Sequence, residues 1–250
     1  MSEIILLAGG IGSGKAYIMN KLLMEKKETG NNIFCLSFAD PIKRIVKDVF
    51  GYDKNGKCIR QGANTNGFDI DFHFNQVIEK IGQMICTDPE ECLDRISIHD
   101  QEELKESIKF FLYTDKSDLD NLKILIRNLM QLIGTEIGQS VKKDIWPSIS
   151  ANVIDCIQES GIDFASIDYI IIDDWRFLFE YFTLYFNFQH EHKITPYYIT
   201  ASPETRARRR KISVDELIKQ SQHYSERESN DVIINWMKIY FPNNIIVNEG

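Results

Sequence analysis

The sequence has few cysteines and no arrangement of them that is typical of a metal site or a disulfide framework. Its five cysteines are odd in number, and none of them forms a C-x-x-C pair. We therefore expect reduced thiols, as in a cytosolic protein. No apolar run reaches the length of a membrane-spanning helix, and no signal peptide precedes the first apolar stretch. These absences favour a cytoplasmic protein without a membrane partner.

The chain also lacks an excess of positive charge. Its 250 residues carry a net charge of −8, so the surface as a whole does not favour nucleic acid or an anionic membrane. A polyanion site would have to be a local basic patch, which suits a small phosphorylated substrate. No internal repeat is present, and the length allows one large α/β domain with insertions or two smaller domains.

A glycine-rich segment near the N-terminus, Gly9 to Lys15, follows an apolar run over 4–8 and precedes helix-compatible sequence over 16–26. This order is the context of a phosphate-binding loop. Glycines let several N–H groups point at one centre, and the helix adds the positive end of its dipole. We therefore expect the loop to bind a nucleoside triphosphate, with a mobile charge from Lys15. The expected contacts are Gly10, Ile11, Gly12, Ser13, Gly14, Lys15 and Ala16.

The loop lacks the hydroxyl that usually follows its lysine. Ala16 and Tyr17 stand where serine or threonine would bind Mg²⁺. We expect Mg²⁺ to be held mainly through phosphates and water, and we name no residue as a metal ligand.

Further strands are expected over 32–38, 168–174, 194–201 and 244–247, and helices over 42–50, 72–84, 101–111, 122–133, 149–158 and 232–239. We expect Asp40 to cap the helix over 42–50, with Pro41 in its first turn. Gly134 and Thr135 are expected to close the helix over 122–133. Residues 52–120 are interpreted as an insertion that covers or flanks the site.

Two carboxylates, Asp173 and Asp174, end the predicted strand over 168–174. The carboxyl ends of parallel strands face the ligand crevice, so we expect one of them to organise Mg²⁺ or a substrate hydroxyl. The densest basic run, from Arg206 to Lys211, directly follows the strand over 194–201. We expect Arg206 and Arg210 to clamp the transferring phosphoryl charge, with RNA binding or nuclear localisation as the alternative.

These residues together resemble the deoxynucleoside monophosphate kinases of tailed bacteriophages over most of the chain, and least over 52–120. Besides the loop, the resemblance rests on the segment 38–43, Arg127-x-x-x-Gln131-x-x-Gly134-Thr135, Trp146, Asp174-Trp175-Arg176 with Glu180, and His223-Tyr224-Ser225-Glu226. It implies an α/β P-loop NTPase fold, with a central parallel sheet flanked by helices. It also implies a single domain over 1–250, a helical insertion and an arginine-rich lid at about 204–231.

The resemblance also implies roles for particular residues. The monophosphate site would be formed by Phe38, Lys43, Arg127, Gln131, Thr135, Trp146, Asp174 and Arg176. Catalysis would involve Lys15, Arg127, Asp174, Arg176, Arg206 and Arg210. Asn248 would belong to the loop that holds the adenine of ATP. Relatives usually continue with another helix after this loop, so an unusually finished adenine pocket is expected.

The implied activity is transfer of the γ-phosphoryl group of ATP to a deoxynucleoside 5′-monophosphate, with Mg²⁺ as cofactor. A dephospho-coenzyme A kinase and a nucleotide-binding pseudokinase that acts through a protein partner are the alternatives. We expect no nucleic-acid partner, and we consider a homodimer. If the protein is phage-encoded, its compartment would be the cytoplasm of the infected cell.

Overall fold

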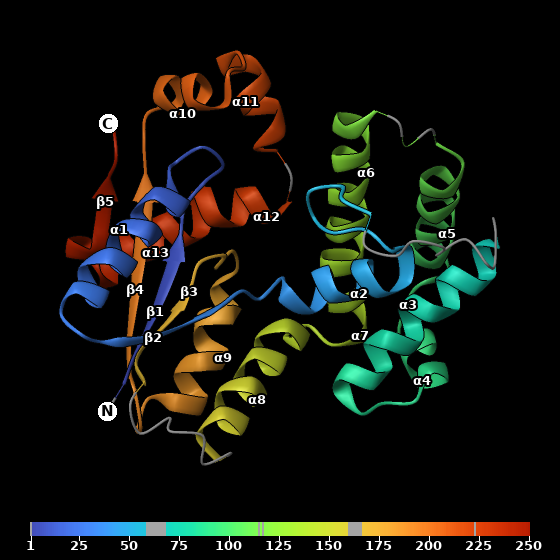
Figure 1. The fold of residues 1–250 in the computed structure, drawn as a ribbon, viewed down its shortest axis with the longest axis horizontal. Coiled ribbons are helices and arrows are strands. Elements are labelled where there is room, and N and C mark those ends of the chain that lie inside the picture. Colours follow the sequence, from blue (N-terminus) through green and yellow to red (C-terminus); the bar gives the residue numbers. More distant parts are fainter. Residues whose placement is uncertain (1, 59–68, 115, 117, 160–166, 223) are drawn as a thin grey trace. The chain divides into compact units, whose positions relative to one another are not determined.

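The computed structural model describes residues 2–58, 69–114, 116, 118–159, 167–222 and 224–250 (Figure 1). Contacts between residues divide the chain into two compact units. Unit 1 comprises Met1–Phe38 and Ser150–Gly250, and unit 2 comprises Ala39–Ile149. Within the described ranges, the strands of the sheet all belong to unit 1.

Unit 1 is built around a five-stranded parallel sheet with the order β2-β3-β1-β4-β5. Its strands are β1 (Glu3–Ala8), β2 (Asn32–Leu36), β3 (Ile167–Ile172), β4 (Lys193–Thr200) and β5 (Ile245–Val247). All five strands predicted from the sequence are present, each ending within two residues of the predicted position. The predicted α/β fold, with a parallel sheet flanked by helices, is confirmed at this level.

The central position of β1 explains its continuous apolar sequence. Both faces of a central parallel strand are covered, so consecutive residues are buried rather than alternate ones. Ile5 and Leu7 pack with Ile171 and Ile199. Helix α1 (Lys15–Glu28) covers this face with four partly buried side chains, Ile18, Met19, Leu22 and Leu23.

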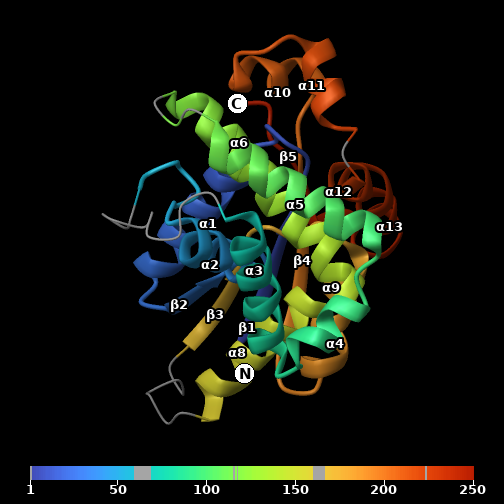
Figure 2. The same ribbon diagram turned by 90° about the vertical axis from the view of Figure 1, so that its right-hand side faces the viewer.

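The opposite face of the sheet is covered by helices α9 (Leu178–Phe188) and α13 (Ile234–Tyr240). Figure 2 shows α1 on one side of the strands and these two helices on the other. Aromatic side chains join α9 to α13, with the rings of Tyr181 and Trp236 centred 4.8 Å apart. Trp175, wholly buried, packs on both rings.

The other helices that lie wholly in unit 1 follow β4. They are α10 (Pro203–Arg210), α11 (Val214–Gln220), α12 (Tyr224–Arg227), the π-helical turn Glu228–Ile233 and the 3₁₀ turn Pro242–Asn244. Helix α8 (Ile145–Glu159) begins in unit 2 and ends in unit 1.

Unit 2 is helical in its described residues. Its elements are α2 (Asp40–Phe50), α3 (Ile70–Ile85), α4 (Pro89–Asp94), α5 (Ile98–Tyr113), α6 (Leu119–Gln131), the π-helical turn Leu132–Ile137 and α7 (Gly138–Val141). Its buried residues include Ile45, Ile81, Leu104, Ile108, Ile126 and Leu129. The ring of Phe50 meets that of Phe111 edge-on at 5.2 Å. No helix of the described ranges is both long and apolar enough to cross a membrane.

Two predictions about helix ends in unit 2 are wrong. Asp40 does not cap α2, because it is the first residue of that helix and its carboxylate lies 2.7 Å from the Lys43 ammonium. Gly134 and Thr135 do not end α6, because the chain continues through a π-helical turn into α7. Trp146 stabilises this continuation, since its indole N–H donates to the Gly134 carbonyl at 2.6 Å.

Candidate functional site

The segment between β1 and α1 adopts a conformation that glycine permits. Gly9 has φ 147°, and a Cβ there would lie 2.2 Å from the Ile199 carbonyl oxygen of β4. Gly14 has φ 89° and is the N-terminal cap of α1. A Cβ on Gly14 would lie 2.3 Å from the Asn248 side-chain nitrogen. The loop therefore needs glycine both for its backbone angles and for the close approach of neighbouring groups.

Ser13 and Lys15 place buried polar groups at the start of α1. Ser13 is 1% exposed, and within the described ranges its hydroxyl has no hydrogen-bond partner. The Lys15 ammonium donates to the Gly9 carbonyl. The first N–H groups of a helix have no partner within the helix, and α1 is 14 residues long. These donors suit a ligand with several anionic oxygens.

The protonated, charged form of the Lys15 amine is destabilised in the folded protein. The pKa of Lys15 is lowered from 10.5 to about 8, chiefly by burial and next by the Arg176 guanidinium. Glu226, Asp174 and Asp173 act in the opposite direction. A phosphate beside this amine would restore its preference for the charged form, because an opposite charge raises the pKa of an ammonium group.

Two arginines of helix α10 donate hydrogen bonds to carbonyl groups of the loop. The Arg206 Nε donates to the Ile11 carbonyl at 2.7 Å, and the Arg209 Nη1 donates to the Ser13 carbonyl at 3.1 Å. Residues three apart lie on one face of a helix, which explains why these two arginines act together. Arg210 is exposed, and its Nη2 lies 3.3 Å from the Gln220 side-chain oxygen. Arg209 was not singled out from the sequence, although its spacing from Arg206 offered a signal.

The ends of β2 and β3 are joined by Asp174. Its Oδ2 accepts from the Ser37 hydroxyl at 2.5 Å, and its Oδ1 accepts from the Phe38 N–H at 2.8 Å. Phe38 itself is buried. Because β3 neighbours β1 in the parallel sheet, Asp174 and Lys15 follow adjacent strand ends, an adjacency that the sequence alone did not predict.

Arg176 is supported by two carboxylates. Its backbone N–H donates to the Glu180 Oε2 at 2.8 Å, and its guanidinium Nη1 lies 2.8 Å from the Glu226 Oε1. Burial raises the pKa of Glu180 to about 8, against the hydrogen bonds from Arg176 and Phe177. Glu226 also accepts from the Ile11 N–H at 3.0 Å. No role was predicted for Glu226 from the sequence, although this residue belongs to the motif His223-Tyr224-Ser225-Glu226.

Asn248, which directly follows β5, also contacts the loop. The Asn248 side-chain nitrogen donates to the Ser13 carbonyl at 3.1 Å, and the Asn248 carbonyl accepts from the Arg209 Nη2 at 3.0 Å. The Glu249 carboxylate accepts from the Ser202 N–H at 2.7 Å and from the Thr205 hydroxyl at 2.7 Å. Asn248, predicted to contact ATP, therefore lies against the glycine-rich loop.

The other predicted substrate residues belong to unit 2. Arg127 is exposed on α6, and Gln131 and Thr135 are partly buried at the passage into the π-helical turn. Trp146 is buried against this turn. Lys43 lines a surface pocket of about 660 Å³ together with Asp40, Arg44, Lys47, Asp48, Asp53, Lys54 and Asn55. His223 of the quoted motif lies outside the described residues.

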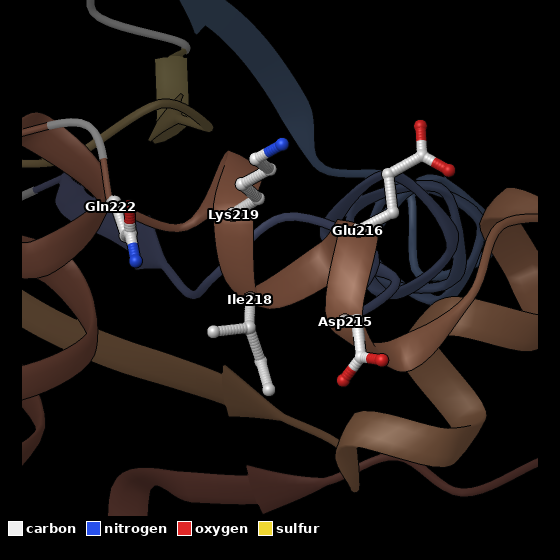
Figure 3. A pocket seen from close by; sticks show the side chains of 5 residues that line it. All are labelled: Asp215, Glu216, Ile218, Lys219 and Gln222. Carbon is white, nitrogen blue, oxygen red and sulfur yellow. The ribbon is translucent and has the colours of Figure 1, made fainter.

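Another pocket, of about 410 Å³, lies on α11 and the residues that follow it (Figure 3). It is lined by Asp215, Glu216, Ile218, Lys219 and Gln222. In Figure 3, Asp215 and Ile218 extend from the same side of the helix. One lysine against two carboxylates does not favour a polyphosphate, so this pocket offers little to a nucleotide.

Over the described ranges, no group of three or more histidine, cysteine, aspartate or glutamate side chains could hold a metal ion. Neither a protein-family model nor a curated protein matches this sequence. The geometry of the loop and its neighbours is therefore what supports a function.

Proposed function

We propose that the protein is a kinase that transfers the γ-phosphoryl group of ATP to a deoxynucleoside 5′-monophosphate. The observation that carries the proposal is the loop at the start of α1. It combines glycine-dependent backbone angles, a buried Ser13 hydroxyl that has no hydrogen-bond partner among the described residues, and the enclosed Lys15 ammonium. A bound polyphosphate would supply a partner for the Ser13 hydroxyl and an opposite charge for Lys15, and glycine permits the backbone angles that such a loop needs.

In this proposal the donor and acceptor are held by different elements. The loop amides and Lys15 hold the phosphates of ATP, while Arg206 and Arg209 fix the loop through its carbonyls. Arg176 holds the acceptor phosphate, and Asp174 orients the end of β3 on which Arg176 depends. An acceptor oxygen attacks the γ-phosphorus in line, the bond to the β-phosphate breaks, and ADP leaves, so no covalent enzyme intermediate is needed.

Residues of unit 2 complete the proposal through the resemblance alone. Arg127, Gln131, Thr135 and Trp146 would form the remainder of the monophosphate site. Arg127 is exposed on α6, and a guanidinium can form a forked contact with a phosphate. Arg210 would act with Arg206 on the transferring group, which stays a prediction.

The described residues do not offer a complete set of metal ligands. Ala16 carries no hydroxyl, and acidic side chains do not gather into a cage within the described ranges. Mg²⁺ in this proposal comes with ATP and is held through phosphate oxygens and water, as is common for this ion.

A second candidate is a nucleotide-binding pseudokinase, which Ala16 favours because it removes a direct metal ligand. Both candidates bind ATP, and they differ in turnover. A coupled assay of ADP release distinguishes them, with the four deoxynucleoside monophosphates and dephospho-coenzyme A as acceptors. ATP affinity is measured in parallel by titration calorimetry.

We expect turnover with at least one deoxynucleoside monophosphate and none with dephospho-coenzyme A. Lys15→Ala should reduce turnover by about 100-fold or more, because the ammonium balances charge that grows in the transition state. Lys21→Ala, an exposed lysine of the same helix, is the matched control and should keep wild-type turnover. ATP binding without turnover would favour the pseudokinase, and absence of ATP binding would exclude both.

A further inference from the structure

The carboxylate of Glu226 is buried between the loop after β1 and the segment after β3. It is 3% exposed and lies in α12. Its Oε1 lies 2.8 Å from the Arg176 guanidinium, and its Oε2 accepts from the Ile11 N–H at 3.0 Å. The partners are 50 and 215 residues away in the sequence. One side chain therefore joins the segment after β3 to the loop after β1.

The environment of Glu226 keeps this carboxylate ionised. Burial on its own would raise the pKa of Glu226, but Arg176, Lys15 and the Ile11 N–H together hold it below its ordinary value. A buried charge is tolerated only when it is paired and hydrogen-bonded. Glu226 meets both conditions, since each of its oxygens has a donor.

The peptide groups on both sides of Ile11 are fixed at the same time. Glu226 accepts from the Ile11 N–H, and Arg206 donates to the Ile11 carbonyl. Removal of Glu226 would release one of these restraints and also remove the carboxylate that lies 2.8 Å from the Arg176 guanidinium. A loop that must aim several N–H groups at one phosphate depends on such restraints.

We propose that Glu226 is a positioning residue that fixes Arg176 relative to the phosphate-binding loop. This inference rests on the proposed kinase function. Glu226 contacts the Arg176 guanidinium and the Ile11 N–H, and in this proposal it acts by orienting the guanidinium that receives the acceptor phosphate. Misplacement of this guanidinium by about 1 Å is enough to lower the rate of an in-line transfer substantially.

The alternative is that Glu226 competes with the nucleotide, and it predicts a different change in the affinity for ATP. A carboxylate that occupied donors needed by phosphate would compete with the nucleotide, and its removal would tighten ATP binding. A positioning carboxylate leaves ATP affinity nearly unchanged and affects the acceptor and the turnover number. The sign of the change in ATP affinity therefore distinguishes the two.

The experiment is a double-mutant cycle on the full chain with Glu226→Gln, Arg176→Gln and the combination of both. For each variant, kcat, the KM of the best deoxynucleoside monophosphate and the Kd of ATP are measured. Glutamine keeps an oxygen that can accept from the Ile11 N–H but loses the charge that holds Arg176. Glu228→Gln, a partly exposed glutamate two residues along, is the matched control and should behave as wild type.

We expect Glu226→Gln to lower kcat/KM for the monophosphate by about 10- to 100-fold, the range of a hydrogen bond to a charged group. The Kd of ATP should change by less than about twofold on the same reasoning. In the Arg176→Gln background, Glu226→Gln should add little, because the group that it positions is already absent. Glu226→Asp keeps the charge on a shorter side chain and should recover part of the loss.

Several outcomes overturn the inference. Tighter ATP binding in Glu226→Gln would show that the carboxylate competes with the nucleotide. Unchanged kcat and KM in Glu226→Gln would exclude a positioning role. A loss of kcat/KM that is as large in the Arg176→Gln background as in the wild type would exclude positioning through Arg176. If Glu226→Gln does not fold, as judged by circular dichroism, Glu226→Asp decides, and wild-type kinetics in it would overturn the inference. Wild-type protein without turnover overturns the proposed function first, and this inference with it.

Discussion

The buried ammonium of Lys15 should make the free protein less stable than it would be with an apolar side chain. Lys15→Met removes the charge and keeps a side chain of similar length. The lowering of the pKa of Lys15 from 10.5 to about 8 corresponds to about 3 kcal/mol against the charged amine at neutral pH. The first cause is burial and the second is Arg176, while Glu226, Asp174 and Asp173 oppose them.

The net gain in the free energy of unfolding of Lys15→Met should be smaller than about 3 kcal/mol. Part of the Lys15 side chain is exposed, and methionine loses the hydrogen bond to the Gly9 carbonyl. We therefore expect Lys15→Met to stabilise unit 1 by about 1–2 kcal/mol at pH 7, after discounting for solvent and the lost hydrogen bond. For a chain of this size, the midpoint of thermal unfolding should rise by about 3–6 °C. Turnover should be lost in the same variant.

The pH dependence provides a sharper test. The unfolded state binds more protons than the folded state between about pH 8 and 10.5, so wild-type stability rises across this window relative to Lys15→Met. The difference in free energy of unfolding between Lys15→Met and the wild type should be largest below pH 8 and vanish near pH 10.5. Thermal unfolding of both proteins followed by circular dichroism at pH 7, 8, 9 and 10 measures it. Lys21→Met, an exposed lysine of the same helix, should show no such trend.

The reasoning would be refuted if Lys15→Met unfolded at or below the wild-type temperature at pH 7. A stability difference that stayed constant from pH 7 to pH 10 would refute it equally, because the charge would then carry no energetic disadvantage in the folded state.

Three further predictions concern other residues. Arg127→Lys should raise the KM of the monophosphate and leave the Kd of ATP unchanged, because lysine cannot form a forked contact; equal losses would exclude Arg127 from the acceptor site. Ala16→Ser should lower the Mg²⁺ concentration needed for half-maximal turnover, and unchanged metal dependence would show that the hydroxyl is dispensable. Gly138→Ala should destabilise unit 2 by about 1–3 kcal/mol in thermal unfolding, because its Cβ would lie 2.2 Å from the Trp146 ring, whereas Gln139→Ala should be nearly neutral.

Local sequence patterns predicted the inner strands well because β1, β3 and β4 are buried over much of their length. The run Ile4–Ala8 is continuously apolar, and the run that ends in Asp173 and Asp174 is apolar over most of its length. The glycine spacing of the loop likewise determines its backbone angles locally. Such features depend on neighbouring residues in the chain, so a single sequence contains them.

The π-helical turn Leu132–Ile137 could not be predicted in the same way. Gly134 has a low helix propensity and is typical of a helix end, but the buried Trp146 indole contacts its carbonyl and favours continuation. The contacts of Glu226 were also invisible, because its partners Ile11 and Arg176 lie far away in the sequence. Tertiary contacts of this kind override or extend what local patterns indicate.

The division of the chain has a consequence for its biosynthesis. Unit 2 is one continuous segment, Ala39–Ile149, whereas unit 1 joins residues from both ends of the sequence. Strand β1 pairs with β3 and β4, and the ion pair between Glu3 and Lys193 spans 190 residues. At about 5–20 residues per second on the ribosome, the apolar β1 waits on the order of ten seconds for its first partner. We expect unit 2 to fold during translation, while β1 depends in that interval on chaperones to avoid pairing with other chains.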